Sequence, residues 1–362
     1  MPAAAQEKVN LLAMSEAELA GFVRELGWPA YRVQQILRWL YRSRAKLVSE
    51  MTDLSHADRE RLTSICTIEQ PSQIRVFSSE DGTRKFVLTL TDKQEVECVL
   101  IPDEERLTLC LSTQVGCTLD CGFCLTGRMG LKRNLRIHEI MNQVLLVHDH
   151  LGDHTRLTNL VFMGMGEPLA NLEAVEEAVV RLTDSRWGLG FSPRRITLST
   201  AGLASRIKDV ARMKVNLAVS LNAPTEEVRR AIMPAVEKMY PLKRLMAACR
   251  AYPLAQRDRL TFEYVLLAGV NDQPEHARAL VRLLRGLRCK VNLIAFNPFP
   301  GSAYHRPSDD VIGSFQKLLR RAHFDVYLRR SRGRDVLGAC GQLGGMVIPS
   351  PAVALTQIQP RC

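Results

Sequence analysis

The chain has 362 residues, of which 46% are hydrophobic and 24% are charged, as is ordinary for a soluble globular protein. No apolar run approaches the roughly 18 residues of a membrane-spanning helix, and the N-terminal segment lacks the apolar core of a signal peptide. We therefore expect a cytoplasmic protein without a membrane segment. The formal net charge of +11 favours a polyanionic partner such as RNA. The chain contains ten cysteines, and in a reducing compartment clustered cysteines bind metal or do redox chemistry more often than they form disulfides.

A small helical unit is predicted at the N-terminus, over residues 1–68. Ser15 is a predicted N-cap, and from there to about Ile65 the apolar residues recur three and four apart. In the second helix the predicted inward residues are Val33, Ile36, Leu37 and Leu40, and the predicted outward residues are Arg32, Arg38, Arg42 and Arg44. This basic face is either an ordinary solvated helix surface, which is the preferred interpretation, or a contact for RNA.

Strand periodicity replaces helical periodicity after Gln73. Alternating runs up to Ser112, separated by turn residues such as Asp81 and Gly82, predict an antiparallel extension over residues 69–106. From there strands alternate with helices, which predicts parallel strands covered by helices. The predicted strands are Leu107–Ser112, Leu157–Met163, Arg195–Ser199, Val215–Leu221, Leu260–Leu267, Lys290–Phe296 and Phe324–Arg329. We expect an α/β fold with a partial (β/α)6 barrel over residues 107–345, followed by a tail, 346–362, to which nothing is assigned.

Polar and glycine-rich motifs follow the predicted barrel strands. Besides a cysteine loop after the first strand, they are GMGEPL from Gly164, LSTAG from Leu198, SLNAP from Ser220 and NPFPG from Asn297. Active sites of β/α barrels form from the loops that follow the strands. Five motifs in the same register therefore predict an active site at that end of the barrel.

The cysteine loop GCTLDCGFC holds Cys117, Cys121 and Cys124 in a C-x3-C-x2-C spacing, which lets one loop surround a compact cluster. A structural zinc site would need a fourth ligand, and neither His138 nor Cys110 is well placed to supply it. The loop therefore predicts a [4Fe–4S] cluster with one iron left open. Zinc and coincidental buried thiols are the alternatives.

A second group, His148, His150 and His154, invites a metal interpretation as well. Alternate residues do not share one face of a helix, so solvated histidines near a helix end are the preferred interpretation.

The motifs together indicate a family. A C-x3-C-x2-C loop with Phe123 before its last cysteine, at the opening of a β/α barrel, resembles the radical S-adenosylmethionine (SAM) enzymes. The segments CLSTQVGC, GLKRNL, VFMGMGEPL, SLNAP, NLIAFNPFPG and ACGQL are together similar to the bacterial dual-specificity rRNA/tRNA adenine C2-methyltransferases, from roughly Leu11 to Gly345. The resemblance implies one [4Fe–4S] cluster, held by the three cysteines with its open iron bound by SAM, and two SAM molecules per turnover. Reduction of the cluster would split SAM and give a 5′-deoxyadenosyl radical.

The resemblance also implies how the methyl group travels. Carbon 2 of adenine is electron-poor, so it accepts a carbon radical where a polar methyl transfer fails. Cys340 would be methylated by one SAM, and hydrogen abstraction with the second would let the methylene radical add to the adenine. Cys110 would resolve the protein–RNA adduct by forming a transient disulfide with Cys340. Glu97 would accept the proton from carbon 2, although Glu95 is a nearby competitor and alternate acidic residues are common on exposed strands.

The same resemblance implies the remaining site residues and partners. The implied SAM contacts are Gly166, Glu167, Ser199, Ser220, Leu221, Asn222 (where many relatives carry histidine) and Asn297. The basic candidates for RNA binding flank the proposed chemistry: Arg128, Lys132, Arg133, Arg136, Arg329, Arg330, Arg332 and Arg334. The implied substrates are an adenosine of 23S rRNA at the peptidyl-transferase centre and the adenosine 3′ to the anticodon in tRNA, each of which must be unstacked. We also expect an electron donor of the flavodoxin kind, and a monomer.

Two rival functions remain. The first is methylation of carbon 8 of the same rRNA adenosine, which confers antibiotic resistance; Val115 stands where those relatives tend to carry cysteine. The second is a non-catalytic RNA-binding protein with a structural metal, against which the paired Cys110 and Cys340 argue. The other cysteines have no motif around them and are predicted to be structural or incidental: Cys66, Cys98, Cys249, Cys289 and Cys362.

Overall fold

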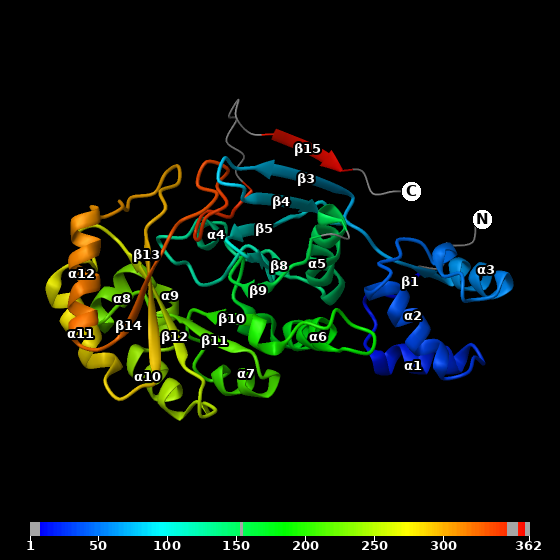
Figure 1. The fold of residues 1–362 in the computed structure, drawn as a ribbon, viewed down its shortest axis with the longest axis horizontal. Coiled ribbons are helices and arrows are strands. Elements are labelled where there is room, and N and C mark those ends of the chain that lie inside the picture. Colours follow the sequence, from blue (N-terminus) through cyan, green and yellow to red (C-terminus); the bar gives the residue numbers. More distant parts are fainter. Residues whose placement is uncertain (1–7, 153–154, 346–353, 359–362) are drawn as a thin grey trace.

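One sheet of eleven strands joins the barrel to the antiparallel extension, in a computed structural model that describes residues 8–152, 155–345 and 354–358 (Figure 1). Seven neighbouring strands are parallel, and each lies within two residues of its predicted position. They are β6 (Arg106–Cys110), β9 (Asn159–Phe162), β10 (Ile196–Thr200), β11 (Asn216–Ser220), β12 (Leu260–Leu266), β13 (Cys289–Ala295) and β14 (Asp325–Arg329). Six crossovers connect them, so the predicted partial barrel is confirmed.

Helices cover the outer face of the parallel strands. In α12, Ile312, Phe315 and Leu319 are buried toward the sheet at helical spacing, and the Ser308 side chain caps the first turn. The covering helices are α5 (Ile137–Leu151), α6 (Leu172–Thr183), α7 (Ile207–Met213), α8 (Glu226–Ile232), α9 (Pro234–Met239), α10 (Leu242–Ala251), α11 (Pro274–Leu284) and α12 (Asp309–Arg321). Within the described ranges, no helix combines the length and apolar character needed to cross a bilayer.

The antiparallel extension continues the same sheet. Its strands are β3 (Gln73–Ser78), β4 (Arg84–Thr89) and β5 (Glu95–Asp103), and β5 pairs with β6, the first barrel strand. The turn predicted at Asp81 and Gly82 joins β3 to β4, with Gly82 at a φ of +83°. Sequence analysis assigned nothing to the tail, but β15 (Ala354–Ile358) pairs antiparallel with β3 and lies at the outer edge of the sheet (Figure 1).

The N-terminal module folds as the helical pattern predicts. It contains α1 (Glu16–Glu25), α2 (Tyr31–Tyr41), the short η1 (Val48–Glu50) and α3 (His56–Ile65). Ser15 is the N-cap of α1 and forms a capping box with Glu18. The predicted inward residues of α2 are all buried. The remaining short elements are β1 (Val9–Asn10), β2 (Cys66–Thr67), β7 (Gln114–Val115), α4 (Leu125–Arg128), β8 (Arg133–Asn134), η2 (Pro168–Asn171) and η3 (Pro193–Arg195).

A buried arginine connects this module to the barrel. Arg181 of α6 is 1% exposed and donates hydrogen bonds to the carbonyls of Leu12 and Met14 and to the hydroxyl of Tyr41. The Tyr41 ring lies 5.4 Å from the ring of Trp187, which follows α6. The module is therefore held against α6, beside which it lies in Figure 1.

Candidate active site

A cavity opens at the carboxyl end of the barrel strands, where the motifs predicted an active site. Its lining brings together nine of the predicted site residues: Cys117, Cys121, Cys124, Gly166, Glu167, Ser199, Ser220, Asn222 and Cys340. Parallel strands end at one edge of a sheet, so loops far apart in sequence converge there. Leu221 and Asn297 are buried and do not form part of this lining.

The cysteine loop is wound tightly beside this cavity. The N–H of Cys124 donates to the carbonyl of Cys121 at 3.0 Å, and the N–H of Gly122 donates to the carbonyl of Ile232 at 3.0 Å. A Cβ atom at Gly127 would lie 2.9 Å from the backbone nitrogen of Cys121, so only glycine fits there without a shift. The three thiols therefore share one wall of the cavity.

The electrostatics of the three thiols favour a metal cluster over free thiolates. Burial raises the pKa of Cys117 to about 12 and also raises the pKa values of Cys121 and Cys124. The thiols are therefore neutral without a ligand, and a metal must displace their protons. In the part of the chain that the structure describes, no three acidic, histidine or cysteine side chains converge as a single-ion site requires. A [4Fe–4S] cluster does not require the three thiols to converge on one point, because each cysteine binds a different iron atom.

A buried cation beside the loop supports this choice. The guanidinium of Arg229 is 0% exposed, pairs with Glu237 and donates to the carbonyl of Ala201, yet its Nη1 has no hydrogen-bond partner among the described residues. Burial dominates the raised pKa of Cys121, and the nearby Arg229 opposes it. An anionic cluster on Cys121 would balance the charge of Arg229. The donor set therefore fits a three-cysteine cluster. Sequence analysis missed Arg229, which lies in a helix after SLNAP.

The GMGEPL loop forms the neighbouring wall. Gly166 has a φ of +96°, and a Cβ atom there would lie 2.5 Å from Cβ of Gln114. The carboxylate of Glu167 accepts from the N–H groups of Leu169, at 3.0 Å, and Ala201, at 2.7 Å, and so ties the end of β9 to the end of β10. Burial raises the pKa of Glu167 to about 7. Since a carboxylate has more than two acceptor positions, Glu167 can still accept from a ligand amine.

The ends of β10 and β11 contribute small polar groups. The hydroxyls of Ser199 and Ser220 lie 3.3 Å apart. Leu221 is fully buried; its N–H donates to the carbonyls of Val219 and of Glu263 on β12, and its carbonyl accepts from the N–H of Ala223. Asn222 has a φ of +56°, a conformation that asparagine tolerates well, and its Oδ1 accepts from the N–H of Val265. The side chain that sequence analysis expected to contact SAM is thus also a structural connection to β12.

The segment that carries Cys340 closes the cavity. Asn297 donates from Nδ2 to the carbonyl of Cys340 at 3.1 Å, and the carbonyl of Gly341 accepts from Leu125 at 2.7 Å. The hydroxyl of Thr126 donates to the carbonyl of Leu343 at 2.5 Å. Hydrogen bonds hold this glycine-rich stretch along its length in this conformation.

Cys110 and Cys340 approach each other despite their separation in sequence. Cys110 ends β6 and is 7% exposed, whereas Cys340 is exposed within the cavity. Burial is the main reason that the pKa of Cys110 is raised, and the nearby Cys340 adds to it. The surrounding protein raises the pKa of Cys340 to about 11. Both are free thiols in the structure.

Glu97 differs sharply from Glu95, two residues earlier on β5. Glu95 forms an ion pair with Arg75 and stays partly exposed. Glu97 is 1% exposed and accepts hydrogen bonds from the N–H groups of Gly344, at 3.2 Å, and Gly345, at 3.0 Å. The alternative of an exposed surface carboxylate is therefore wrong for Glu97, which lies against the Cys340 segment.

The basic candidates for RNA binding differ in availability. Arg128, Lys132, Arg136, Arg329, Arg330 and Arg334 are exposed. Arg128 also donates to the carbonyl of Gly301 and lies over the Phe299 ring. Arg133 forms ion pairs with Glu139 and Asp92, so it would have to exchange partners to bind a phosphate. Arg332 lies 3.7 Å from Asp103. The RNA contacts stay predictions.

The histidine group near the end of α5 does not form a metal site in the part of the chain that the structure describes. His150 lies 3.1 Å from the guanidinium of Arg84, and its ring packs edge-on against Phe86. These contacts are packing interactions rather than the solvated positions that sequence analysis preferred. His154 lies outside the described residues.

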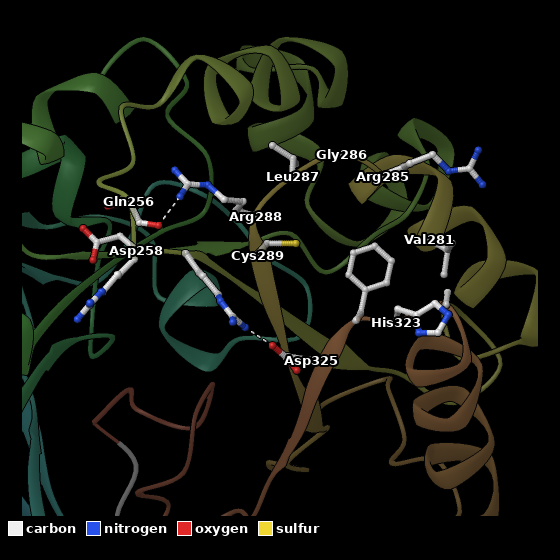
Figure 2. A pocket seen from close by; sticks show the side chains of 14 residues that line it. Gln256, Asp258, Val281, Arg285, Gly286, Leu287, Arg288, Cys289, His323 and Asp325 are labelled. Atoms are coloured by element: carbon white, nitrogen blue, oxygen red, sulfur yellow. Dashed lines mark hydrogen bonds and ion pairs between the residues drawn. The ribbon is translucent and has the colours of Figure 1, made fainter.

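A second cavity lies at the opposite end of the barrel, where β12, β13 and β14 begin (Figure 2). Two of its four arginines have partners: Arg259 pairs with Asp325, and Arg288 donates to the carbonyl of Gln256. Helices α11 and α12 end here, and basic residues offset the partial negative charge of helix carboxyl ends. These contacts account for part of the basic lining without a ligand.

A partial β/α barrel with a three-cysteine loop after its first strand defines the radical SAM class of enzymes. Residues 111–281 match the radical SAM superfamily, and residues 9–68 match the ribosomal RNA large subunit methyltransferase N-terminal domain.

The similarity extends to particular proteins. The chain is 47% identical to the dual-specificity RNA methyltransferase RlmN of Syntrophus aciditrophicus, over 94% of this chain and 98% of that protein. It is 44% identical to RlmN of Bdellovibrio bacteriovorus, over 93% of this chain and 84% of the relative. A radical SAM methyltransferase structure from Sphaerobacter thermophilus aligns with a TM-score of 0.87 at 42% identity, covering 92% of this chain and 98% of that one. The chain therefore belongs to the RlmN family of dual-specificity RNA methyltransferases, which implies a [4Fe–4S] cluster and SAM.

Proposed function

We propose that this enzyme methylates carbon 2 of an adenosine in 23S rRNA, at the peptidyl-transferase centre, and of the adenosine 3′ to the anticodon in tRNA. The observation that carries the proposal is the approach of Cys110 to Cys340 at a cavity that also holds Cys117, Cys121 and Cys124. A methyltransferase that passes the methyl group directly from SAM to its substrate has no use for such a thiol pair. The relatives named dual-specificity RNA methyltransferases support the two RNA classes.

The cysteine loop would hold a single cluster through Cys117, Cys121 and Cys124. When bound, the cluster and two successive SAM molecules supply the methyl group and the hydrogen-abstracting radical. Glu167 would accept from the SAM amine, and the backbone at Gly166 would lie against the cofactor. Ser199, Ser220, Leu221, Asn222 and Asn297 are the other proposed contacts, of which Leu221 and Asn297 are not part of the cavity lining.

Cys340 would carry the methyl group, because its thiol is exposed within the cavity. After the carbon–carbon bond to adenine forms, Glu97 would take the proton from carbon 2, and the cluster, when bound, would accept the one surplus electron of the adduct. Cys110 would then attack the sulfur of Cys340. The S–S bond would form as the S–C bond to the RNA adduct breaks, and the electron pair would leave with the released carbon, which would take up the thiol proton of Cys110 to complete the methyl group. An external donor of the flavodoxin kind would supply electrons, and we propose that a monomer acts in the cytoplasm.

The test uses anaerobically prepared protein with reductant, SAM labelled in its methyl group, and protein-free large-subunit rRNA or tRNA. Digestion followed by chromatography and mass spectrometry identifies the labelled nucleoside. We expect 2-methyladenosine, and none with Cys340→Ala. Labelled 8-methyladenosine would move the enzyme to the rival carbon 8 activity. No labelled nucleoside, despite an intact cluster that cleaves SAM, would contradict the proposed substrates.

A further inference from the structure

A lysine and a glutamate form a buried ion pair beside the Cys340 segment. Nζ of Lys85, on β4, lies 3.7 Å from Oε1 of Glu97, on β5, and each side chain is 1% exposed. Burying two charges is costly unless each finds a partner and further hydrogen bonds. Neither the motifs nor the family resemblance gives Lys85 a role.

Glu97 connects this pair to the segment that carries Cys340. Its two carboxylate oxygens accept from the N–H groups of Gly344 and Gly345, four and five residues after Cys340. The other end of the segment is held by the bond from Leu125 to the carbonyl of Gly341. Thr126 adds a bond to the carbonyl of Leu343, and the carboxylate fixes the two glycines that follow it.

The strength of this attachment depends on charge. A backbone N–H binds a carboxylate about twice as strongly as a neutral acceptor. Burial raises the pKa of Glu97, and Lys85 is the largest of the influences that oppose it. The other charged or titratable groups nearby are Glu95 on the same strand, Arg75 on β3, which pairs with Glu95, and the thiol of Cys98. Lys85 is the cation that faces Glu97 directly.

We propose that Lys85 is a positioning residue whose ammonium group keeps Glu97 ionised. The ionised carboxylate anchors Gly344 and Gly345, in the segment after Cys340, and is able to accept a proton. The anchoring follows from the contacts of the fold alone. The readiness to accept a proton rests on the proposed function of Glu97. When the proton from carbon 2 moves to a Glu97 oxygen, the ion pair loses its negative partner, and the segment is held less strongly.

The anchoring is tested by hydrogen exchange of the purified protein, followed by mass spectrometry of peptides that cover residues 338–345. We expect faster exchange there in Lys85→Met and a rate near wild type in Lys85→Arg, which keeps the charge. Arg84→Met is the matched control, because it removes the neighbouring cation on β4, which contacts His150 rather than Glu97. Unchanged exchange in Lys85→Met would overturn the anchoring.

A double variant keeps the test valid if the single one fails to fold. Lys85→Met combined with Glu97→Gln removes both charges, so no buried ion is left alone. If Lys85 acts through Glu97, the double variant and Glu97→Gln alone exchange at the same rate over residues 338–345. A further acceleration in the double variant would show that Lys85 acts on the segment by another route.

The second readout is the pH dependence of methylation in single-turnover reactions. Without Lys85, Glu97 stays protonated to a higher pH, so the acid limb of the profile should move up by about one unit or more in Lys85→Met. Lys85→Arg should restore it, whereas a purely structural defect lowers the rate at every pH. An unmoved acid limb would overturn this role of Lys85. If wild-type enzyme makes no 2-methyladenosine, the proposed function fails, and hydrogen exchange still decides the anchoring.

Discussion

Arg181 donates a hydrogen bond to the hydroxyl of Tyr41 at 2.8 Å, across the junction between α6 of the barrel and α2 of the N-terminal module. The same guanidinium satisfies the carbonyls of Leu12 and Met14. One side chain of the barrel therefore supplies hydrogen bonds to three polar groups of the N-terminal module. The attachment of the module depends on it more than on any surface pair.

Arg181→Met should loosen the N-terminal module. Each buried group left without its partner costs on the order of 1–3 kcal/mol, so we expect a loss of about 2–4 kcal/mol in the free energy of unfolding. Urea titrations measure this loss, and hydrogen exchange should show it first in α1 and α2. Arg212→Met is the control, because its pairs with Glu176 and Asp209 lie on the surface and are worth about 0–1 kcal/mol. Equal losses in the two variants would contradict the junction's importance.

Cys124→Ala should abolish assembly of an intact cluster, because two protein ligands remain where three are proposed. Iron and sulfide content and the visible absorbance of anaerobically reconstituted protein provide the measurement. Cys249→Ala removes another buried thiol, on α10, and should keep the iron content of the wild type. Full iron content in Cys124→Ala would exclude this cysteine as a ligand.

Cys110→Ser should trap the enzyme on its RNA. Without the resolving thiol, the adduct between Cys340 and the adenine cannot be released as a disulfide, so covalent protein–RNA species should accumulate. A denaturing gel with labelled RNA detects them. Cys98→Ala is a close control, since Cys98 is a fully buried thiol on the adjacent strand β5. Turnover by Cys110→Ser at the wild-type rate would rule out its role.

Gly166→Ala should weaken SAM binding by at least about tenfold. The new methyl group would meet Gln114 and would force a side chain into a conformation with a φ of +96°. The neighbouring Glu167 would then shift. Equilibrium dialysis with labelled SAM measures the effect. Gly313→Ala, in the middle of α12 with nothing within 4 Å, should leave binding unchanged and stabilise the fold by about 0.5–1 kcal/mol.

The stability of the fold should fall as the pH drops below about 6.5, in part because of His138. Its side chain is 2% exposed and lies 3.1 Å from Glu69, and burial lowers its pKa below the ordinary 6.5. Between these two pKa values the unfolded chain binds a proton that the folded chain does not bind, so stability rises with pH across this window. Urea unfolding at pH 5–7 measures the slope, which should be smaller in His138→Gln. An identical slope would assign the pH dependence to other groups.

Local chemistry made several features predictable. Ser15 is a helix cap because its hydroxyl lies within reach of nearby N–H groups. The spacing of Cys117, Cys121 and Cys124 predicts a shared ligand because residues so close along the chain lie in one short loop. The alternation of strands and helices fixed the barrel, because parallel strands need covered crossovers.

Contacts between distant segments were not predictable. Alternation placed Glu97 on a strand, but whether that face meets water depends on the Gly344–Gly345 segment lying across it. Asn222 could be taken for a ligand contact because nothing local reveals its bond to Val265. Arg181 and Arg229 looked like ordinary helix residues, and only the packing of other elements around them makes them buried connections.

Strand β6 pairs antiparallel with β5 on one side and parallel with β9 on the other. Glu97 and Cys110 lie on the two strands of the first pairing, and Cys110 faces Val161 across the second. The extension cannot separate from the barrel without breaking the ladder that carries Cys110, the proposed resolving thiol. Amide protection should therefore be lost from β5, β6 and β9 in one cooperative opening. A barrel grafted onto another chain would have to include the extension.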